Sequence, residues 1–255
     1  MAVWVVADGL VKAGLFACVA VVQHRFDSVE AADLHGRGRA LRPVGLIFAA
    51  GALAIASLPP FGPFAGKSVL EDAALAAPGY GWVPAAMLLV TGLVGGTLLR
   101  ACARIFWGLG VPAPRDPAGE GPERESEGGA RALALSAAAL TAAGVAWGLV
   151  PGLVPAAARA AAAFTDRTGY AAAVLDGRAL EAPAPSLHGP GATAYLYAAG
   201  SLALAVAVAL VGATRRVPIP GPVDALRRLH SGRPGDYVAW AVAGAAVLVS
   251  LIALR

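Results

Sequence analysis

The two lysines of the chain, Lys12 and Lys67, lie inside strongly apolar stretches, whereas all 18 arginines fall in loops or toward the ends of apolar segments. An ammonium group can release its proton when it is removed from water, but a guanidinium effectively never does. The choice of lysine at these two positions therefore makes proton handling the first hypothesis.

Each lysine has a carboxylate four residues away. Asp8 precedes Lys12, and Glu71 follows Lys67. Residues four apart share one helical face at ion-pairing distance. A carboxylate lowers the cost of a charge in the bilayer and keeps the lysine protonated until the pair is disturbed, so such a pair can act as a switch. The alternative is that the lysines extend to an interface, with the acidic groups near the water line.

The composition predicts the environment of these pairs. The chain is 58% hydrophobic and only 14% charged, with a mean hydropathy of +0.67. Together with several apolar runs long enough to cross a bilayer, this predicts an all-α fold, a polytopic bundle of transmembrane helices. Cys18 and Cys102 lie in apolar segments without metal-ligand spacing and are expected to be buried free thiols.

The apolar segments predict about six crossings, at residues 2–23, 43–77, 82–106, 132–150, 193–213 and 237–254. We expect three regions: core helices at 1–109, a flexible acidic loop at 110–131, and C-terminal transmembrane helices at 132–255 with an interfacial helix near 152–175.

The second crossing contains a predicted helix break at Pro59, Pro60, Gly62 and Pro63. Prolines remove amide donors and clash with the preceding turn, so the helix cannot continue through them. Non-helical backbone at membrane depth persists only where protein or water satisfies its polar groups. Freed backbone groups beside Lys67 are what a proton path needs. The alternative is a simple kink, or a tight turn between two short helices.

The arginine distribution favours one broken crossing over two. With one crossing at 43–77, 14 arginines fall on one side of the membrane and 4 on the other. With two crossings the split is 10 against 8. Because basic loops concentrate on the cytoplasmic side, we expect one discontinuous crossing, with both termini of the chain outside.

Two sequence blocks carry a resemblance to a known family. The stretch VADGLVKAGLFACVAVV is followed, after a polar loop, by RPVGLIFAAGALAIASLPPFGPFAGKSVLEDA. This pairing resembles the distal part of the antiporter-like subunits of respiratory complex I, the Mrp cation/proton antiporters and the membrane-bound group 4 hydrogenases. The closing LRRLHSGRPGDYVAWAVAGAAVL is similar to C-terminal ends in these families.

The resemblance implies roles for both ion pairs. Lys67 matches the channel lysine of the discontinuous helix, and Lys12 matches the relay lysine behind it, with Asp8 and Glu71 as modulating counter-charges. The chain departs from the family pattern in having Asp8 where a histidine is common and in lacking the first of two inverted repeats. Residues 214–236 are also too few for the long amphipathic helix of the most distal complex I subunit, so a smaller Mrp-like or hydrogenase-like assembly, or a stand-alone paralogue, fits better.

These observations predict a proton-translocating, antiporter-like subunit of the bacterial cytoplasmic (inner) membrane. Its partners would be other membrane subunits, including a polypeptide that supplies the missing N-terminal helices. The alternative is a non-conducting structural or assembly subunit, a degenerate or split half of such a subunit. A small-solute transporter is disfavoured because the crossings contain few other polar side chains. The sequence contains no nucleophile constellation, phosphate-binding loop or metal-ligand cluster, so we expect no catalytic site, cofactor or metal of its own.

Overall fold

The computed structural model describes residues 2–31, 33–112, 130–149 and 190–214, with isolated residues between 152 and 174 and residue 246. The elements in these ranges are all helical and lie in one compact unit, Met1–Arg216. Four helical segments are long and apolar enough to cross a membrane: Trp4–Phe26, Arg37–Ile55, Val83–Trp107 and Ala192–Thr214. They confirm an all-α fold and indicate an integral membrane protein.

The long helices lie close to the predicted crossings. Helix α1 is Ala2–Phe26, α4 is Val83–Trp107 and α8 is Ala192–Thr214. A 3₁₀ helix, η1 (Arg37–Leu41), leads directly into α2 (Arg42–Ile55), and α5 (Ala130–Ala146) is shorter, at 17 residues. The predicted crossing at 237–254, the interfacial helix at 152–175 and the acidic loop at 110–131 fall almost entirely outside the described residues.

A non-helical segment at residues 56–61 separates α2 from α3 (Gly62–Ala76). Pro59 and Pro60 lie in this segment, as predicted, but Gly62 and Pro63 form the first turn of α3. A proline is tolerated there because the first amides of a helix have no intrahelical partner. The interruption instead begins further upstream, where buried Ser57 adopts a left-handed backbone conformation with φ of 68°.

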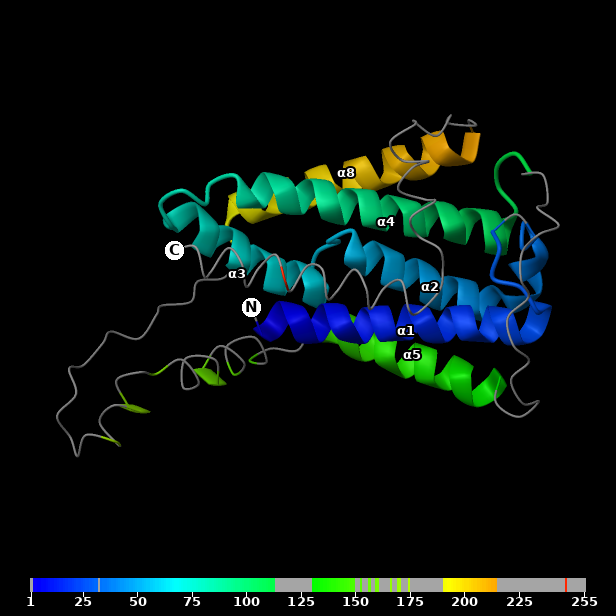
Figure 1. Cartoon of the computed structure of the whole chain (residues 1–255), viewed down its shortest axis with the longest axis horizontal. Coiled ribbons are helices and arrows are strands. Elements are labelled where there is room, and N and C mark those ends of the chain that lie inside the picture. Colours follow the sequence, from blue (N-terminus) through cyan, green and yellow to red (C-terminus); the bar gives the residue numbers. More distant parts are fainter. Residues whose placement is uncertain are drawn as a thin grey trace. The chain divides into compact units, whose positions relative to one another are not determined.

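Helices α2 and α3 follow one another along α1 (Figure 1). Their contacts run from Val44 with Cys18, through Gly51 with Leu15 and Gly62 with Ala7, to Gly66 with Trp4. Positions on α1 decrease steadily as positions on α2 and α3 increase. Both short helices are therefore antiparallel to the same long helix and advance in one direction.

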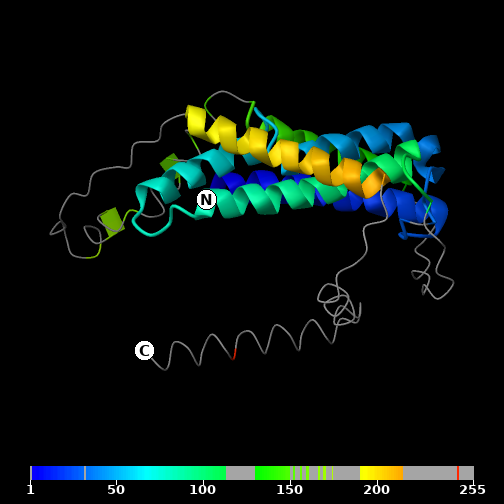
Figure 2. The same cartoon turned by 90° about the horizontal axis from the view of Figure 1, so that it is seen from above.

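Helices α4 and α8 are parallel neighbours, packed through glycines (Figure 2). The glycine contacts pair Gly92 with Leu204, Gly96 with Val208, Gly200 with Leu88 and Gly212 with Arg100. The constant offset between these positions fixes the register of the two helices. Gly92 and Gly96 permit this close packing, because small residues let helix backbones approach each other in a membrane.

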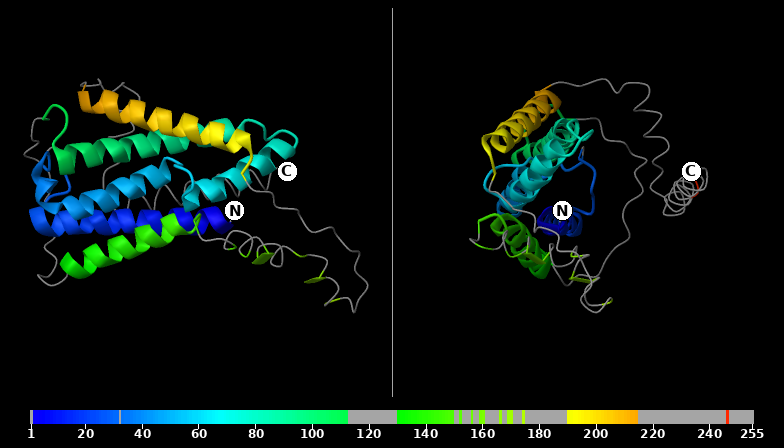
Figure 3. Two further views of the ribbon diagram at one scale, coloured as in Figure 1. Left: turned by 180° about the vertical axis from the view of Figure 1, so that it is seen from behind. Right: turned by 90° about the vertical axis from the view of Figure 1, so that its left-hand side faces the viewer.

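Helix α5 packs antiparallel against α1, on the side away from α4 and α8 (Figure 3). Gly14 faces Thr141, and Gly144 faces Val11. Just beyond α5, Gly148 lies against the carbonyl oxygen of Pro60, while Gly95 of α4 lies against Ala56. Protein therefore encloses the interruption between α2 and α3 on two sides, as irregular backbone in a bilayer requires.

Candidate functional site

Lys67 and Glu71 occupy successive turns of α3 and form an ion pair. The Lys67 Nζ and Glu71 Oε1 atoms lie 3.4 Å apart, and their side chains are only 1% and 2% exposed. The helix that carries them begins at Gly62, directly after the interruption, so Lys67 lies in its second turn. The structure thus brings the predicted pair together and buries it completely.

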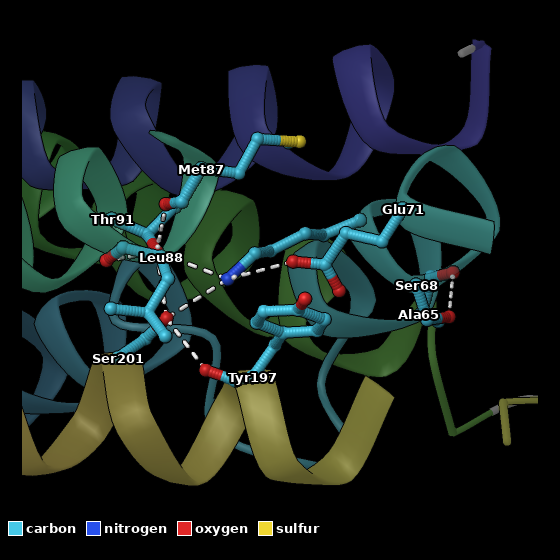
Figure 4. A network of polar contacts seen from close by, with 9 residues as sticks. Ala65, Ser68, Glu71, Met87, Leu88, Thr91, Tyr197 and Ser201 are labelled. Atoms are coloured by element: carbon cyan, nitrogen blue, oxygen red, sulfur yellow. Dashed lines mark hydrogen bonds and ion pairs between the residues drawn. The ribbon is translucent and has the colours of Figure 1, made fainter. Parts of the chain in front are cut away.

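Two hydroxyl groups from other helices complete the surroundings of the ammonium (Figure 4). Lys67 Nζ donates to Ser201 Oγ of α8 at 2.9 Å and to Thr91 Oγ1 of α4 at 3.1 Å. An ammonium has three N–H donors. With Glu71 as the third neighbour, the number of acceptors equals the number of donors. The acceptors come from three helices, α3, α4 and α8.

Each hydroxyl is oriented by its own helix. Thr91 Oγ1 donates to the carbonyl of Met87 at 2.7 Å, and Ser201 Oγ donates to the carbonyl of Tyr197 at 3.0 Å. Such bonds to the preceding turn are common for hydroxyl side chains in helices. Because they use the hydroxyl proton, the oxygen lone pairs remain for Lys67. The two hydroxyl oxygens are 3.1 Å apart.

The Glu71 carboxylate is held less firmly than the ammonium. Its Oε1 atom is buried, and within the described part of the chain it forms no hydrogen bond. The 3.4 Å approach to Lys67 Nζ is therefore an ion pair rather than a well-formed hydrogen bond. A buried carboxylate in this situation depends on the charge of its lysine partner.

The second predicted pair also forms, but in different surroundings. Lys12 Nζ lies 2.5 Å from Asp8 Oδ2, and the two side chains are 51% and 15% exposed. The pair is on the face of α1 that the other described helices leave uncovered. In the described residues, no hydrogen bond or ion pair connects it to Lys67. The structure therefore does not bring the two lysines into one site.

Sequence reasoning missed Thr91 and Ser201. Both are hydroxyl residues inside long apolar segments, and each is adjacent to a glycine, in Thr91-Gly92 and Gly200-Ser201; exposed Thr97, beside Gly96, shares this pattern. A hydroxyl beside a small residue marks a position where another helix approaches closely and can be reached by a polar group. That combination was the available signal.

The described residues contain no group of three His, Cys, Asp or Glu side chains able to hold a metal ion. Cys18 and Cys102 are free and buried, as predicted. Comparison of the chain with models of protein families, with curated proteins and with solved structures finds no match. The resemblance carried by the LPPFGPFAGK block therefore stays a prediction.

Proposed function

We propose that this chain is a proton-translocating, antiporter-like membrane subunit of an NADH-dehydrogenase-like, Mrp-like or hydrogenase-like complex, and that Lys67 relays the proton. The observation that carries the proposal is the fully buried Lys67–Glu71 pair, held by two hydroxyls directly after a helix interruption. Ionisable groups inside membrane helices are costly to bury and usually mark ion pathways or proton relays.

The depth of the site supports this role. Thr91 and Ser201 lie eight and nine residues after the first residues of α4 and α8. At 1.5 Å per residue, these positions are about 12 to 14 Å from the helix ends, which is inside a hydrocarbon layer of about 30 Å. A proton that reaches Lys67 has therefore entered the bilayer.

The proposal treats α2, residues 56–61 and α3 as one discontinuous crossing. Helix α3 has 15 residues, about 22 Å, which is too short to cross the bilayer alone. The uniform direction of α2 and α3 along α1 and the asymmetry of the arginines support the same topology. Loop 23–42 then faces the cytoplasm, and both termini face outward across a bacterial cytoplasmic membrane.

The proposed step is a proton transfer within the buried pair. The N–H bond of the Lys67 ammonium breaks, an O–H bond forms on Glu71, and a charged pair becomes a neutral amine and a neutral acid. The net charge of the site does not change, so the transfer adds no uncompensated charge at membrane depth. A shift of α3 against α4 and α8 would alter the contacts of Lys67 and so favour either the charged or the neutral form of the pair.

The partners in this proposal are other membrane subunits of the complex. Redox or cation-exchange events in those subunits would drive the shift. Lys12 and Asp8 would form a second relay element within that assembly.

The direct test is Lys67→Ala in the native assembly, with proton pumping measured in membrane vesicles. We expect pumping to be lost while the assembly persists. Ser68→Ala is the matched control, because its hydroxyl donates to Ala65 of its own helix and is buried beside the pair. Undiminished pumping in Lys67→Ala would overturn the proposal.

A second candidate function is a non-conducting structural subunit. The observation that favours it is the separation of the two lysine pairs: in the described residues, no polar contact leads from Lys67 toward Lys12. A structural subunit would tolerate Lys67→Ala in the pumping assay, whereas deletion of the whole chain would abolish assembly.

A further inference from the structure

The other described helices leave one face of α1 uncovered, and this face carries a charge. We name this face the α1 stripe; it consists of Val5, Gly9, Lys12, Phe16 and Val19. Phe16 is 74% exposed and the Lys12 side chain 51% exposed. The opposite face of α1, with Ala7, Val11 and Cys18, is fully buried in the bundle.

Lipid is a poor cover for this stripe. Lys12 lies eight residues after the start and fourteen before the end of the apolar segment Trp4–Phe26. These separations are about 12 and 21 Å, and a lysine side chain does not easily reach an interface over such distances. Hydrocarbon offers no acceptor for the N–H groups that Asp8 leaves free, so an exposed ammonium at this depth requires a polar neighbour.

The shape of the stripe suits a helix. Its residues are spaced alternately four and three apart, which is the spacing that one partner helix covers at a shallow crossing angle. At Gly9, an added Cβ would meet nothing within 4 Å, so the surface there is open. Small residues of this kind allow two helix backbones to approach closely in a membrane, while Phe16 and Val19 provide larger groups for packing.

We propose that the α1 stripe is the docking face for a transmembrane helix of a different polypeptide, which presents a carboxylate or hydroxyl acceptor to Lys12. The charges favour such a partner because the ammonium points outward while Asp8 is only 15% exposed. A second copy of this chain fits poorly. Parallel two-fold pairing through the stripe would place Lys12 opposite Lys12 at the same depth, and like charges oppose association. The inference does not depend on proton transport and applies equally to a structural subunit.

Photocrosslinking in native membranes tests the proposal. A photoreactive amino acid replaces Phe16 in the stripe or, as a control, Leu196, which is 73% exposed on α8. We expect an adduct at position 16 whose crosslinked peptide is a transmembrane segment of another polypeptide and contains Asp, Glu, Ser or Thr. The control position should give no such adduct. An adduct within the same chain, for example with the predicted crossing at 237–254, with a second copy of the chain, or with lipid alone would overturn the proposal.

Two further substitutions test the contact itself. Gly9→Leu adds bulk at a position where an added Cβ meets nothing within 4 Å, and it should lower the adduct yield about tenfold. Ala203→Leu places the same side chain at an exposed position on α8 and should leave the yield unchanged. Lys12→Met keeps the length of the side chain but removes the charge, and should also lower the yield. A partner that binds Gly9→Leu and Lys12→Met normally would show that the stripe is not its docking face.

Discussion

Lys67 Nζ and Ser201 Oγ lie 2.9 Å apart although the two residues are separated by 134 positions in the sequence. Thr91 Oγ1 lies 3.1 Å from Ser201 Oγ, and the meeting of these two hydroxyls beside Lys67 depends on the parallel register of α4 and α8, which Gly92 and Gly96 set by their close approach to α8. Thr91 is the neighbour of Gly92, so the glycine interface and the hydroxyls of the site occupy the same level of the bundle. Helix packing therefore positions the ligands of the buried ammonium.

The first prediction concerns the mutual dependence of Lys67 and Glu71. Lys67→Met leaves the Glu71 carboxylate buried without a counter-charge and should destabilise the protein by about 3 kcal/mol. The double variant Lys67→Met/Glu71→Gln removes both charges and should recover most of that loss. Unfolding of the purified protein in detergent measures both values.

The exposed pair provides the control for this comparison. Lys12→Met breaks an ion pair whose lysine is half exposed, so in detergent it should cost less than about 1 kcal/mol. Equal losses for Lys67→Met alone and for the double variant would contradict the dependence of Glu71 on Lys67.

The second prediction concerns the hydroxyls. Ser201→Ala and Thr91→Val each remove an acceptor from a buried ammonium, and hydrogen bonds to charged groups contribute about 2 kcal/mol. Thr97→Val is the matched control for Thr91→Val, because Thr97 lies on the same helix and donates to Val94 but is exposed. If all three variants unfold at the same denaturant concentration, the hydroxyls do not hold Lys67.

The sequence predicted those elements that depend on local composition. Continuous apolar runs indicated α1, α4 and α8 closely, and the prolines indicated the interruption before Lys67. The spacing of four residues also predicted both ion pairs, because that relationship is set within one helix.

The remaining features depend on contacts between distant segments. A proline can end one helix or stand in the first turn of the next, where the backbone amides have no intrahelical partner. The sequence alone does not distinguish these two positions for Pro63. The meeting of Thr91 and Ser201 beside Lys67 depends on the register of α4 and α8. The outward orientation of Lys12 depends on which face of α1 the other helices cover, and an ion pair with Asp8 is possible on any face.

The third prediction tests the register of α4 and α8. A Cβ at Gly96 would lie 2.7 Å from the Cβ of Val208 and 2.8 Å from the carbonyl oxygen of Ala205. Gly96→Ala should therefore push the helices apart and cost about 1 to 3 kcal/mol. It should also reduce the effect of a subsequent Ser201→Ala, because the Lys67–Ser201 contact is then already weakened.

Gly9→Ala is the control for the glycine interface. Its added Cβ meets no neighbour, and alanine favours a helix, so this variant should be more stable by about 0.5 to 1 kcal/mol. A Gly96→Ala protein as stable as Gly9→Ala would show that α4 and α8 tolerate a wider separation than their glycine contacts indicate.

The last prediction tests whether α2 and α3 share one crossing. Ala40→Cys lies before α2 and Tyr80→Cys lies after α3, both at exposed positions. Each is placed in a chain whose buried thiols are removed by Cys18→Ala and Cys102→Ala. One discontinuous crossing puts the two positions on opposite sides of the membrane. An impermeant maleimide applied to intact spheroplasts should then label position 80 but label position 40 only after the membrane is opened.

If both positions react in intact spheroplasts, or neither does, the chain enters and leaves the membrane on the same side through α2 and α3. The interruption beside Lys67 would then be a turn between two short helices rather than a discontinuity within one crossing.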